Sequence, residues 1–458
     1  MTKTKKIGRS NAIDMVNGPM LGKILLFTLP IIGSNILQCL FNTADMIVVS
    51  YFEGDIALGA VGTNTSLISL ITALFVGLAT GAGVCVSVAL GARRERDTAE
   101  LVHTAMATAL ISGVLVAAIG YFGAPFFLSL MNVEDELLAM ATSYLRVYLL
   151  GAPALMVYNF GFGIMRSLGD TRRPLWYMAI AGVVNIGFNL LFVAVFGLGV
   201  VGVALGTVLS VTVSAILVVL SLCRYQNACR LSLRHLRISP RRLLEIMRIG
   251  VPAGLRGILF GISNTMLQAS VNSLGPAATS GNATASSLEN FLYFAVSAFG
   301  QTVTVFAGQN YGAGKPRRVR RSVGLCVLLS CAIGTVAGWA MILLREPLVG
   351  LYLTEGSTAI PWAYERMTIT FAFYFLEGLF ETLAGALQGI KISMAPTVAA
   401  IFSICGFRLF WIFVIFPLDT FHSITGLYAC YPISWIIISL VLFGMICYYY
   451  PRRCPSRS

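Results

Sequence analysis

The sequence contains few charged residues. Only 11% of its 458 residues are Asp, Glu, Lys or Arg, whereas 57% are hydrophobic, and an ordinary soluble domain has about a quarter of its residues charged. This composition excludes a globular protein of the cytosol. Uncharged stretches long enough to cross a bilayer as helices, about 20 residues each, recur along the whole chain. We therefore predict an all-α polytopic membrane protein.

The sequence also lacks the motifs of common enzymes and metal sites. Its three His residues are isolated, and its ten Cys residues are scattered without C-x-x-C pairs, so we expect neither disulfides nor zinc ligands. Residues 197–202 match G-x-G-x-x-G, but they lie between two predicted spans rather than in a βαβ unit. Gly314-Lys315 lacks the upstream glycine of a P-loop. We predict that the protein is not an enzyme and uses no cofactor.

Twelve membrane-spanning helices are predicted from the uncharged stretches. The longest stretch, residues 174–223, is too long for one crossing, and Gly197-Leu198-Gly199 supplies a turn within it. An even number of spans places both termini on the same side of the membrane. The predicted helices cover residues 24–50, 58–90, 101–130, 139–165, 174–196, 200–223, 245–272, 283–309, 322–344, 363–389, 393–417 and 424–449.

The basic residues gather on one side of this predicted topology. The chain has 32 Lys and Arg against 19 Asp and Glu, a net charge of +13, and 27 of the 32 cations, Arg166 among them, fall in the termini or in loops on the same side. Arg366 is one of the few cations of the opposite side. Loops rich in Lys and Arg face the cytoplasm, so both termini are predicted to be cytoplasmic. We therefore expect the charge to serve topology and contact with the lipid bilayer, and we expect no nucleic-acid partner.

The two halves of the chain are copies of one unit, related by a nearly constant offset in residue number. Pro30 corresponds to Pro252, and Asn42-Thr43 corresponds to Asn264-Thr265. Gly54 corresponds to Gly275 at an offset that is shorter by one position. Each copy has six spans, so both insert with the same orientation about a pseudo-two-fold axis along the membrane normal, an arrangement typical of alternating-access transporters. The predicted parts are a cytoplasmic segment 1–23, an N-terminal six-helix lobe 24–223, a basic linker 224–242, a C-terminal six-helix lobe 243–450 and a cytoplasmic tail 451–458.

Polar side chains follow one face of the first predicted helix, because Gln38, Asn42 and Asp45 recur at steps of three and four. Ionisable groups in membrane spans mark ion or substrate pathways. Asp45 with amide and hydroxyl oxygens forms a set of hard ligands for Na⁺, and the same carboxylate alternatively binds a proton. The other reading is that the amides and hydroxyls only join helices through hydrogen bonds. The candidate ligands on later helices are Asn185, Asn189 and Thr207.

The tenth predicted helix carries Glu377 and Glu381 one turn apart. Two such carboxylates repel each other when both are ionised, so they are candidates for proton coupling or for binding a cationic substrate. The alternative is a structural ion pair with Arg256 or Arg408. Glu289 lies near the end of its span, where a water-facing anchor is an equally good interpretation. The other candidate residues of this half are Asn264, Gln268, Tyr293 and Gln301.

Three segments resemble the multidrug and toxic compound extrusion (MATE) family of secondary transporters. They are Phe41-Asn42-Thr43-Ala44-Asp45, residues 308–314 with the sequence GQNYGAG, and Tyr431-Pro432-Ile433-Ser434-Trp435. The resemblance extends over the whole chain and includes the repeat of six spans. It implies a V-shaped pair of lobes that exchanges Na⁺ or H⁺ for organic, often cationic, compounds.

The resemblance also implies roles for individual residues. Asp45 matches the first-helix ion-binding aspartate of the family, Asn185 its fifth-helix asparagine and Thr207 its sixth-helix threonine. Asn189 stands where the DinF-like branch usually has an aspartate. Glu381 matches a tenth-helix glutamate of a related bacterial subgroup, whereas residues 257–261 contain no acid where the NorM-like branch has one.

We predict from the sequence a monomeric antiporter of the bacterial cytoplasmic membrane that exports amphipathic organic cations in exchange for Na⁺ or H⁺. One alternative is a flippase for lipid-linked oligosaccharides or lipids, which would need cations in its cavity to hold a pyrophosphate. Another is a membrane scaffold or receptor without transport activity, which would leave the polar helix faces unexplained. A major facilitator protein is excluded, because residues 91–96 do not fit the loop motif of that family.

Overall fold

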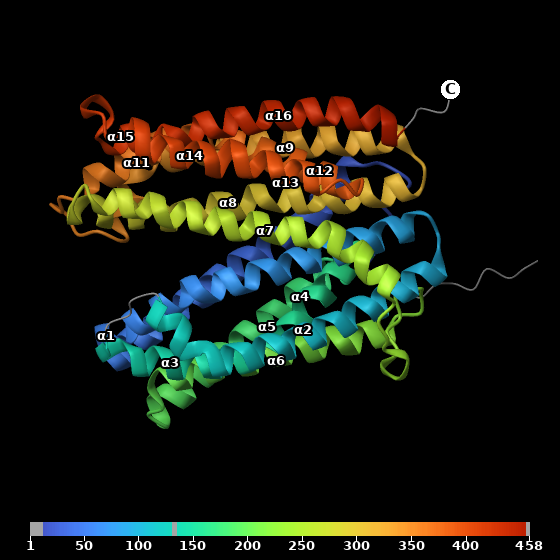
Figure 1. The fold of residues 1–458 in the computed structure, drawn as a ribbon, viewed down its shortest axis with the longest axis horizontal. Helices are drawn as coiled ribbons and strands as arrows, with labels where there is room; N and C mark the ends of the chain where they lie inside the picture. Colours follow the sequence, from blue (N-terminus) through green and yellow to red (C-terminus); the bar gives the residue numbers. More distant parts are fainter. Residues whose placement is uncertain (1–11, 131–134, 455–458) are drawn as a thin grey trace, which may run out of the picture.

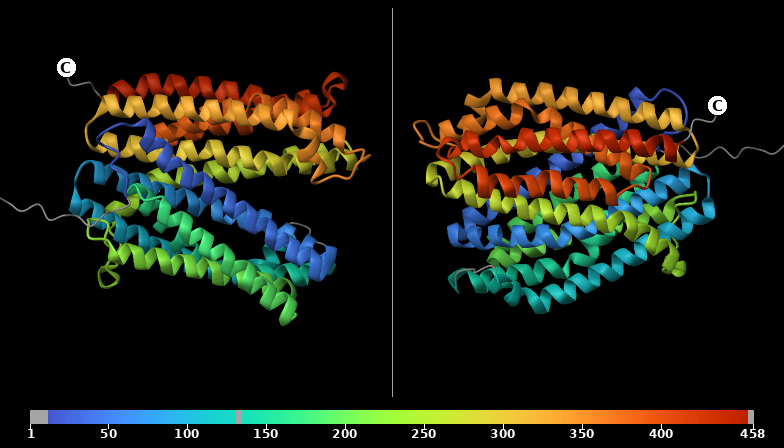
Figure 2. Two further views of the ribbon diagram at one scale, coloured as in Figure 1. Left: turned by 180° about the vertical axis from the view of Figure 1, so that it is seen from behind. Right: turned by 45° about the horizontal axis from the view of Figure 1, so that its top comes forward.

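A computed structural model describes residues 12–130 and 135–454. Helices make up nearly all of these two ranges, which contain no β-strand. The helices form two bundles that lie side by side, one with α1 to α6 (blue to green) and one with α7 to α16 (yellow to red) (Figure 1). Views from behind and from a tilted angle show the same division (Figure 2). The predicted all-α architecture of two helical lobes is confirmed.

The first lobe begins with a helix that contains two predicted spans. α1 runs over Leu21–Gly91 and is interrupted at Gly54, where φ is 78° and ψ is −171°. Only glycine adopts this backbone conformation without strain, so Gly54 marks the turn between the two spans. The other helices of this lobe are α2 Glu95–Leu130, α3 Asp135–Leu150, α4 Ala152–Ser167, α5 Arg172–Asn189, the π-helical segment η1 Leu190–Val195 and α6 Gly199–Arg224.

The second lobe begins at Pro240 after a linker that contains the short helix η2 Leu233–His235. Its long helices alternate with short π-helical and 3₁₀ segments. They are α7 Pro240–Asn272, α8 Pro276–Gly312, α9 Pro316–Leu343, α10 Arg345–Gly350, α11 Ile360–Ala372, α12 Tyr374–Gly389, α13 Met394–Ala400, η3 Ile401–Gly406, α14 Phe407–Phe410, η4 Trp411–Ile415, η5 Asp419–Phe421, α15 Ile424–Tyr428 and α16 Cys430–Arg453.

The repeat seen in the sequence recurs in the backbone. Two predicted spans are broken, and their breaks at Gly151 and Phe373 are related by the same offset as Pro30 and Pro252. The bend is 49° between α3 and α4 and 46° between α11 and α12. Gly275, at φ 104°, repeats the turn of the first lobe. The two lobes therefore share their local geometry as well as their residue pattern.

A helix occupies the place of each of the twelve predicted spans. Nine helices in the described ranges are long and apolar enough to cross a membrane, and the two bent pairs raise the number to eleven. The remaining span, α7, fails this test of apolar length. It carries Arg256, Asn264 and Gln268, and it faces the polar interior of its lobe instead of exposing only apolar groups to lipid.

The two lobes touch backbone to backbone where α1 crosses α7. A Cβ atom added at Gly77 would lie 2.2 Å from the Gly254 nitrogen, and one added at Gly81 would lie 2.6 Å from the Ile246 carbonyl oxygen. Small residues allow such close approach of membrane helices. These glycines therefore fix how near the lobes can come to each other.

A second contact between the lobes obeys the pseudo-two-fold symmetry. A Cβ atom at Gly91 would lie 1.9 Å from the Gln309 carbonyl oxygen, and one at Gly312 would lie 2.0 Å from that of Val88. Gly91 and Gly312 occupy equivalent positions of the two lobes, and so do Val88 and Gln309, so each contact is the symmetric counterpart of the other. Thr28 and Thr302, both almost fully buried, share a hydrogen bond of 2.8 Å between α1 and α8.

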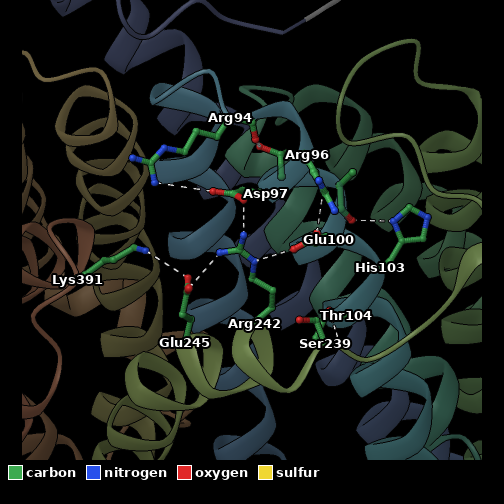
Figure 3. Close-up of polar contacts among 12 residues, drawn as sticks. Arg94, Arg96, Asp97, Glu100, His103, Thr104, Ser239, Arg242, Glu245 and Lys391 are labelled. Carbon is green, nitrogen blue, oxygen red and sulfur yellow. Dashed lines mark hydrogen bonds and ion pairs between the residues drawn. The ribbon is translucent and has the colours of Figure 1, made fainter.

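A cluster of ion pairs joins the two lobes near the start of α7 (Figure 3). The Arg242 guanidinium contacts Asp97 and donates to Glu100 at 3.2 Å and to Glu245 at 3.1 Å. Lys391 lies 3.6 Å from the second oxygen of Glu245. Burial disfavours the charge of Arg242, but the hydrogen bond to Glu100 and the charges of Asp97 and Glu245 raise its pKa, so this arginine stays charged at physiological pH.

Candidate functional site

The first lobe contains a cluster of oxygen atoms around Asp45. Asn189 Nδ2, at the end of α5, donates to Asp45 Oδ1 at 2.5 Å, and Thr207 Oγ1 on α6 donates to Asp45 Oδ2 at 3.3 Å. Asn185 Nδ2 lies 3.5 Å from Thr207 Oγ1, and Asn185 Oδ1 accepts from Asn189 at 3.5 Å. The structure thus brings together all four residues named as candidate ion ligands.

The local backbone explains how Asn189 reaches this cluster. The π-helical segment η1 begins at the next residue, Leu190, and π-bulges often occur at functional sites because they turn side chains out of the ordinary helical register. A Cβ atom at Gly206 would lie 2.0 Å from Asn189 Oδ1, so only glycine at this position of α6 leaves room for the amide.

One atom of the cluster has an unsatisfied hydrogen-bonding capacity. Asn189 is fully buried, and its Oδ1 has no hydrogen-bond partner in the described ranges. A buried carbonyl oxygen without a partner is costly. In the structure this oxygen lies against Gly206, and Asn189 Nδ2 faces Asp45 and Asn185. If the amide turned over, its oxygen would join the Asp45 oxygens, the Asn185 carbonyl and the Thr207 hydroxyl as hard ligands for a small cation.

The two other polar candidates of the first helix lie apart from this cluster. Gln38 and Asn42 are exposed on α1, and neither lines the cavities described below. Their spacing puts Gln38 and Asn42 near the same face of α1 as Asp45. However, the other helices that pack against Asp45 do not cover this face at Gln38 and Asn42, so these two side chains stay exposed. Asn35, one turn before Gln38, does reach the cavity between the lobes.

A cavity of about 480 Å³ lies inside the second lobe. Six of the seven candidate residues of this half line it, and Gln301 lies elsewhere. Its walls also contain two arginines, Arg366 and Arg408, and several aromatic rings. The six candidates are Asn264, Gln268, Glu289, Tyr293, Glu377 and Glu381.

Glu289 forms an ion pair inside this cavity. Its carboxylate accepts from the Arg366 guanidinium at 2.5 Å, and Arg366 also donates to Asn282 O and Oδ1 at 2.6 Å. Arg366, counted with the few cations of the outer side, lies on α11 within the predicted span 363–389 and is only 3% exposed. An arginine can be buried there because a carboxylate, an amide and the Tyr428 ring, 4.7 Å away, surround it.

The two glutamates of α12 have different partners. Glu381 lies 3.8 Å from Arg256, the structural pairing named as an alternative. Glu377 is 9% exposed and has no hydrogen bond or ion pair to any described residue. Arg408 lies 3.8 Å above the Tyr431 ring and donates to Asn264 Oδ1 at 3.4 Å. Glu377 is therefore the carboxylate of this cavity that is free to receive a ligand.

A second cavity, of about 300 Å³, lies between the lobes. Tyr293 and Glu381 line both cavities, so the two adjoin. Gln301 of α8 lies here, where its side chain contacts Arg166. The placement of Arg166 in a cytoplasmic loop was wrong, since the residue belongs to α4 and lines this cavity. Counting charges along the sequence could not place a side chain at the end of a span.

Comparison with known proteins decides the family. The family model MatE matches residues 30–191 and again residues 252–414, so the two matches start at the repeated prolines Pro30 and Pro252. The chain belongs to the MatE family. Its membership confirms the resemblance seen in the sequence and makes this chain a transporter, not an enzyme.

Several members of known or assigned function are similar along nearly their full length. The probable multidrug resistance protein YoeA of Bacillus subtilis is 25% identical over 94% of both chains. The FAD transporter of Shewanella oneidensis is 24% identical over 90% of both chains. A solved structure described as the outward-facing conformation of a MATE family transporter shares the fold, with a TM-score of 0.88 at 21% identity over 98% of this chain and 99% of its own.

Proposed function

We propose that this MatE protein is a secondary antiporter that exports amphipathic organic compounds, cations among them, in exchange for Na⁺ or H⁺. Its similarity to multidrug resistance proteins supports efflux of such compounds. The observation that carries the coupling is the cluster around Asp45, in which the buried Asn189 Oδ1 has no hydrogen-bond partner among the described residues. The amide presents its Nδ2 to Asp45 and its Oδ1 to Gly206, so a coupling cation would be held by this oxygen and the carboxylate together once the amide turns over.

The proposed coupling follows from the charge of Asp45. In one state of the cycle the carboxylate binds Na⁺ or a proton, and Asn185, Asn189 and Thr207 supply the remaining oxygens. The helices α1, α5 and α6, which carry these ligands, contact one another, so loading the site changes how they pack. Binding can drive export only if the ion prefers one orientation of the lobes to the other.

The proposed binding region for the solute is the pair of adjoining cavities. Glu377 offers an unpaired carboxylate to a cationic group, and the aromatic rings of Tyr293, Tyr431 and Trp435 offer apolar contact. We place both termini in the cytoplasm of a bacterium and the protein in its cytoplasmic membrane as a monomer. The similarity to an outward-facing structure supports an outward-facing state, in which the glycine contacts close the cytoplasmic end.

Transport in proteoliposomes tests this proposal. Ethidium transport is measured with an imposed pH gradient alone and with an imposed Na⁺ gradient alone, and the effective gradient identifies the coupling ion. Asp45→Asn keeps the size of the side chain but removes its charge, and we expect it to abolish gradient-driven transport. Ser50→Ala, an exposed change on the same helix, is the matched control and should transport normally. Unchanged ethidium transport by Asp45→Asn would refute the proposed coupling.

A further inference from the structure

The cavity between the lobes lies on the pseudo-two-fold axis. Arg166 of α4 and Gln388 of α12 both line it, and they correspond at the offset that relates Pro30 to Pro252. Equivalent positions of the two lobes therefore both line this cavity. Thr80 and Gln301 form a second pair of lining residues, at the slightly shorter offset of the two turn glycines. Arg166 breaks this symmetry, because it places a positive charge where the other lobe has a neutral amide.

The Arg166 guanidinium has no carboxylate partner within the described ranges. Its Nε donates to the Phe162 carbonyl oxygen at 3.4 Å within α4, and its Nη1 donates to Gln301 Oε1 across the lobes. The other two charged residues of the cavity, Arg256 and Glu381, lie 3.8 Å from each other. The cavity therefore carries one positive charge that no protein group compensates.

An uncompensated guanidinium in a membrane protein marks a functional position. Its five N–H groups form a planar fork that matches the two oxygens of a carboxylate, and the amides of Asn35 and Asn159 and the hydroxyl of Thr304 line the same cavity. We propose that Arg166 binds the carboxylate of a transported zwitterion, so that this residue sets the preference for such a solute over the same solute with its carboxylate blocked. This inference rests on the proposed transport function.

The adjoining cavity supplies the complementary site. Glu377 lines the cavity of the second lobe with its carboxylate unpaired, and Tyr293 lies in the walls of both cavities. A solute that extends past Tyr293 reaches Glu377 at one end, with Arg408 in the same walls, and Arg166 at the other. Opposite charges at the two ends of one binding region favour a zwitterion over a simple cation.

Two dyes that differ in one group test this inference. Rhodamine B carries a free carboxylate and a delocalised cation, whereas rhodamine B ethyl ester is the same dye with the carboxylate blocked. Binding of each dye to the purified full-length protein is measured by fluorescence anisotropy without any gradient. We expect Arg166→Gln to weaken rhodamine B binding about tenfold or more, the loss typical of a charge-assisted hydrogen bond, and to leave binding of the ester within about twofold.

Two further variants test the charge of Arg166. Arg166→Lys keeps the charge and should retain most of the preference for rhodamine B. Arg172→Gln removes an exposed cation that lines neither cavity, and it should also retain the preference. An equal loss of both dyes in Arg166→Gln would show that Arg166 only joins the lobes and would overturn the inference. So would unchanged binding of both dyes, or failure of the wild type to bind rhodamine B.

Transport is measured separately on the same variants, so the two proposals fail in different ways. A protein that binds the dyes with the expected selectivity but transports neither supports the Arg166 site and contradicts the antiport. A protein that transports the ester in response to a gradient, with no effect of Arg166→Gln on rhodamine B, supports the antiport and contradicts the Arg166 site.

Discussion

Arg242 of α7 donates a hydrogen bond of 3.2 Å to Glu100 of α2 and so joins the two lobes across their line of contact (Figure 3). The same guanidinium holds Asp97 and Glu245, so three carboxylates that would repel one another converge on a single cation. These residues lie beside the glycine contacts of α1 and α7. If the lobes separate during transport, this cluster is one of the first groups of contacts to break.

We therefore expect Arg242→Gln to favour opening of this end of the protein. Cys85 is fully buried in the same hydrophobic cluster as Ile246 and Ile249 of α7, which makes it a native reporter. A charged thiol reagent should label Cys85 about tenfold faster or more in Arg242→Gln than in the wild type, as measured by mass spectrometry. Arg241→Gln, an exposed neighbour, is the control. Equal labelling of all three proteins would mean that the cluster does not hold the lobes together.

The glycine contact leads to a second prediction. Gly77→Ala would place a Cβ atom 2.2 Å from the Gly254 nitrogen, whereas Gly62→Ala on the same helix meets nothing within 4 Å. Overpacking of this kind costs about 1–3 kcal/mol, and in the proposed transport cycle this cost would fall on the arrangement of the lobes seen in the structure. Gly77→Ala should therefore speed Cys85 labelling and slow dye transport, and Gly62→Ala should do neither. Normal transport by Gly77→Ala would show that the close approach is dispensable.

The third prediction concerns the amide at the Asp45 cluster. Asn189→Asp replaces a group that donates to Asp45 at 2.5 Å with a second carboxylate, and two carboxylates at this distance need a cation or a proton between them. We expect transport by Asn189→Asp to depend more steeply on Na⁺ concentration or on acid pH than transport by the wild type. Asn189→Ala, which removes the donor without adding charge, should not show that steeper dependence. Identical ion dependence in the wild type and Asn189→Asp would contradict the site.

The fourth prediction separates a structural carboxylate from a functional one. Glu289 compensates Arg366, which is only 3% exposed, and removing one partner of a buried ion pair costs about 3–5 kcal/mol. Glu289→Gln should therefore lower the midpoint of thermal unfolding in detergent by several degrees, whereas Glu377→Gln should not, because Glu377 has no such partner in the described part of the chain. The exposed Glu346→Gln is the control. An unchanged midpoint in Glu289→Gln would mean that water solvates Arg366.

The candidate residues could be predicted to different degrees. The resemblance to a family pointed to Asp45, Asn185 and Thr207, and spacing on one helix pointed to Glu377 and Glu381. Spacing alone also pointed to Gln38 and Asn42, which the structure leaves exposed. A helical face is defined along one helix, whereas a site is defined by what the neighbouring helices place against that face.

Arg166 and Arg366 are two residues whose surroundings could not be predicted from the distribution of charge along the sequence. Both lie near ends of predicted spans, where a charge is assigned to one side of the membrane because lysine and arginine commonly flank spans. In the structure Arg166 lines the cavity between the lobes and Arg366 pairs with Glu289 inside the second lobe. Ion pairs such as Arg256 with Glu381 could be named from the sequence only as alternatives, because several acids and several arginines were available.

The sequence by itself predicted where the helical segments lie, their order and the repeat, all of which the structure contains, whereas the distribution of charge between the two sides of the membrane stays a prediction. These properties are local, since hydropathy, turn glycines and loop cations act within about one helix length. Only the tertiary structure decided which polar groups meet: Asp45 contacts Asn189 from 144 residues away and Thr207 from 162 residues away. Such contacts depend on how whole helices cross, which is set by glycines, breaks and π-helical segments acting together in three dimensions.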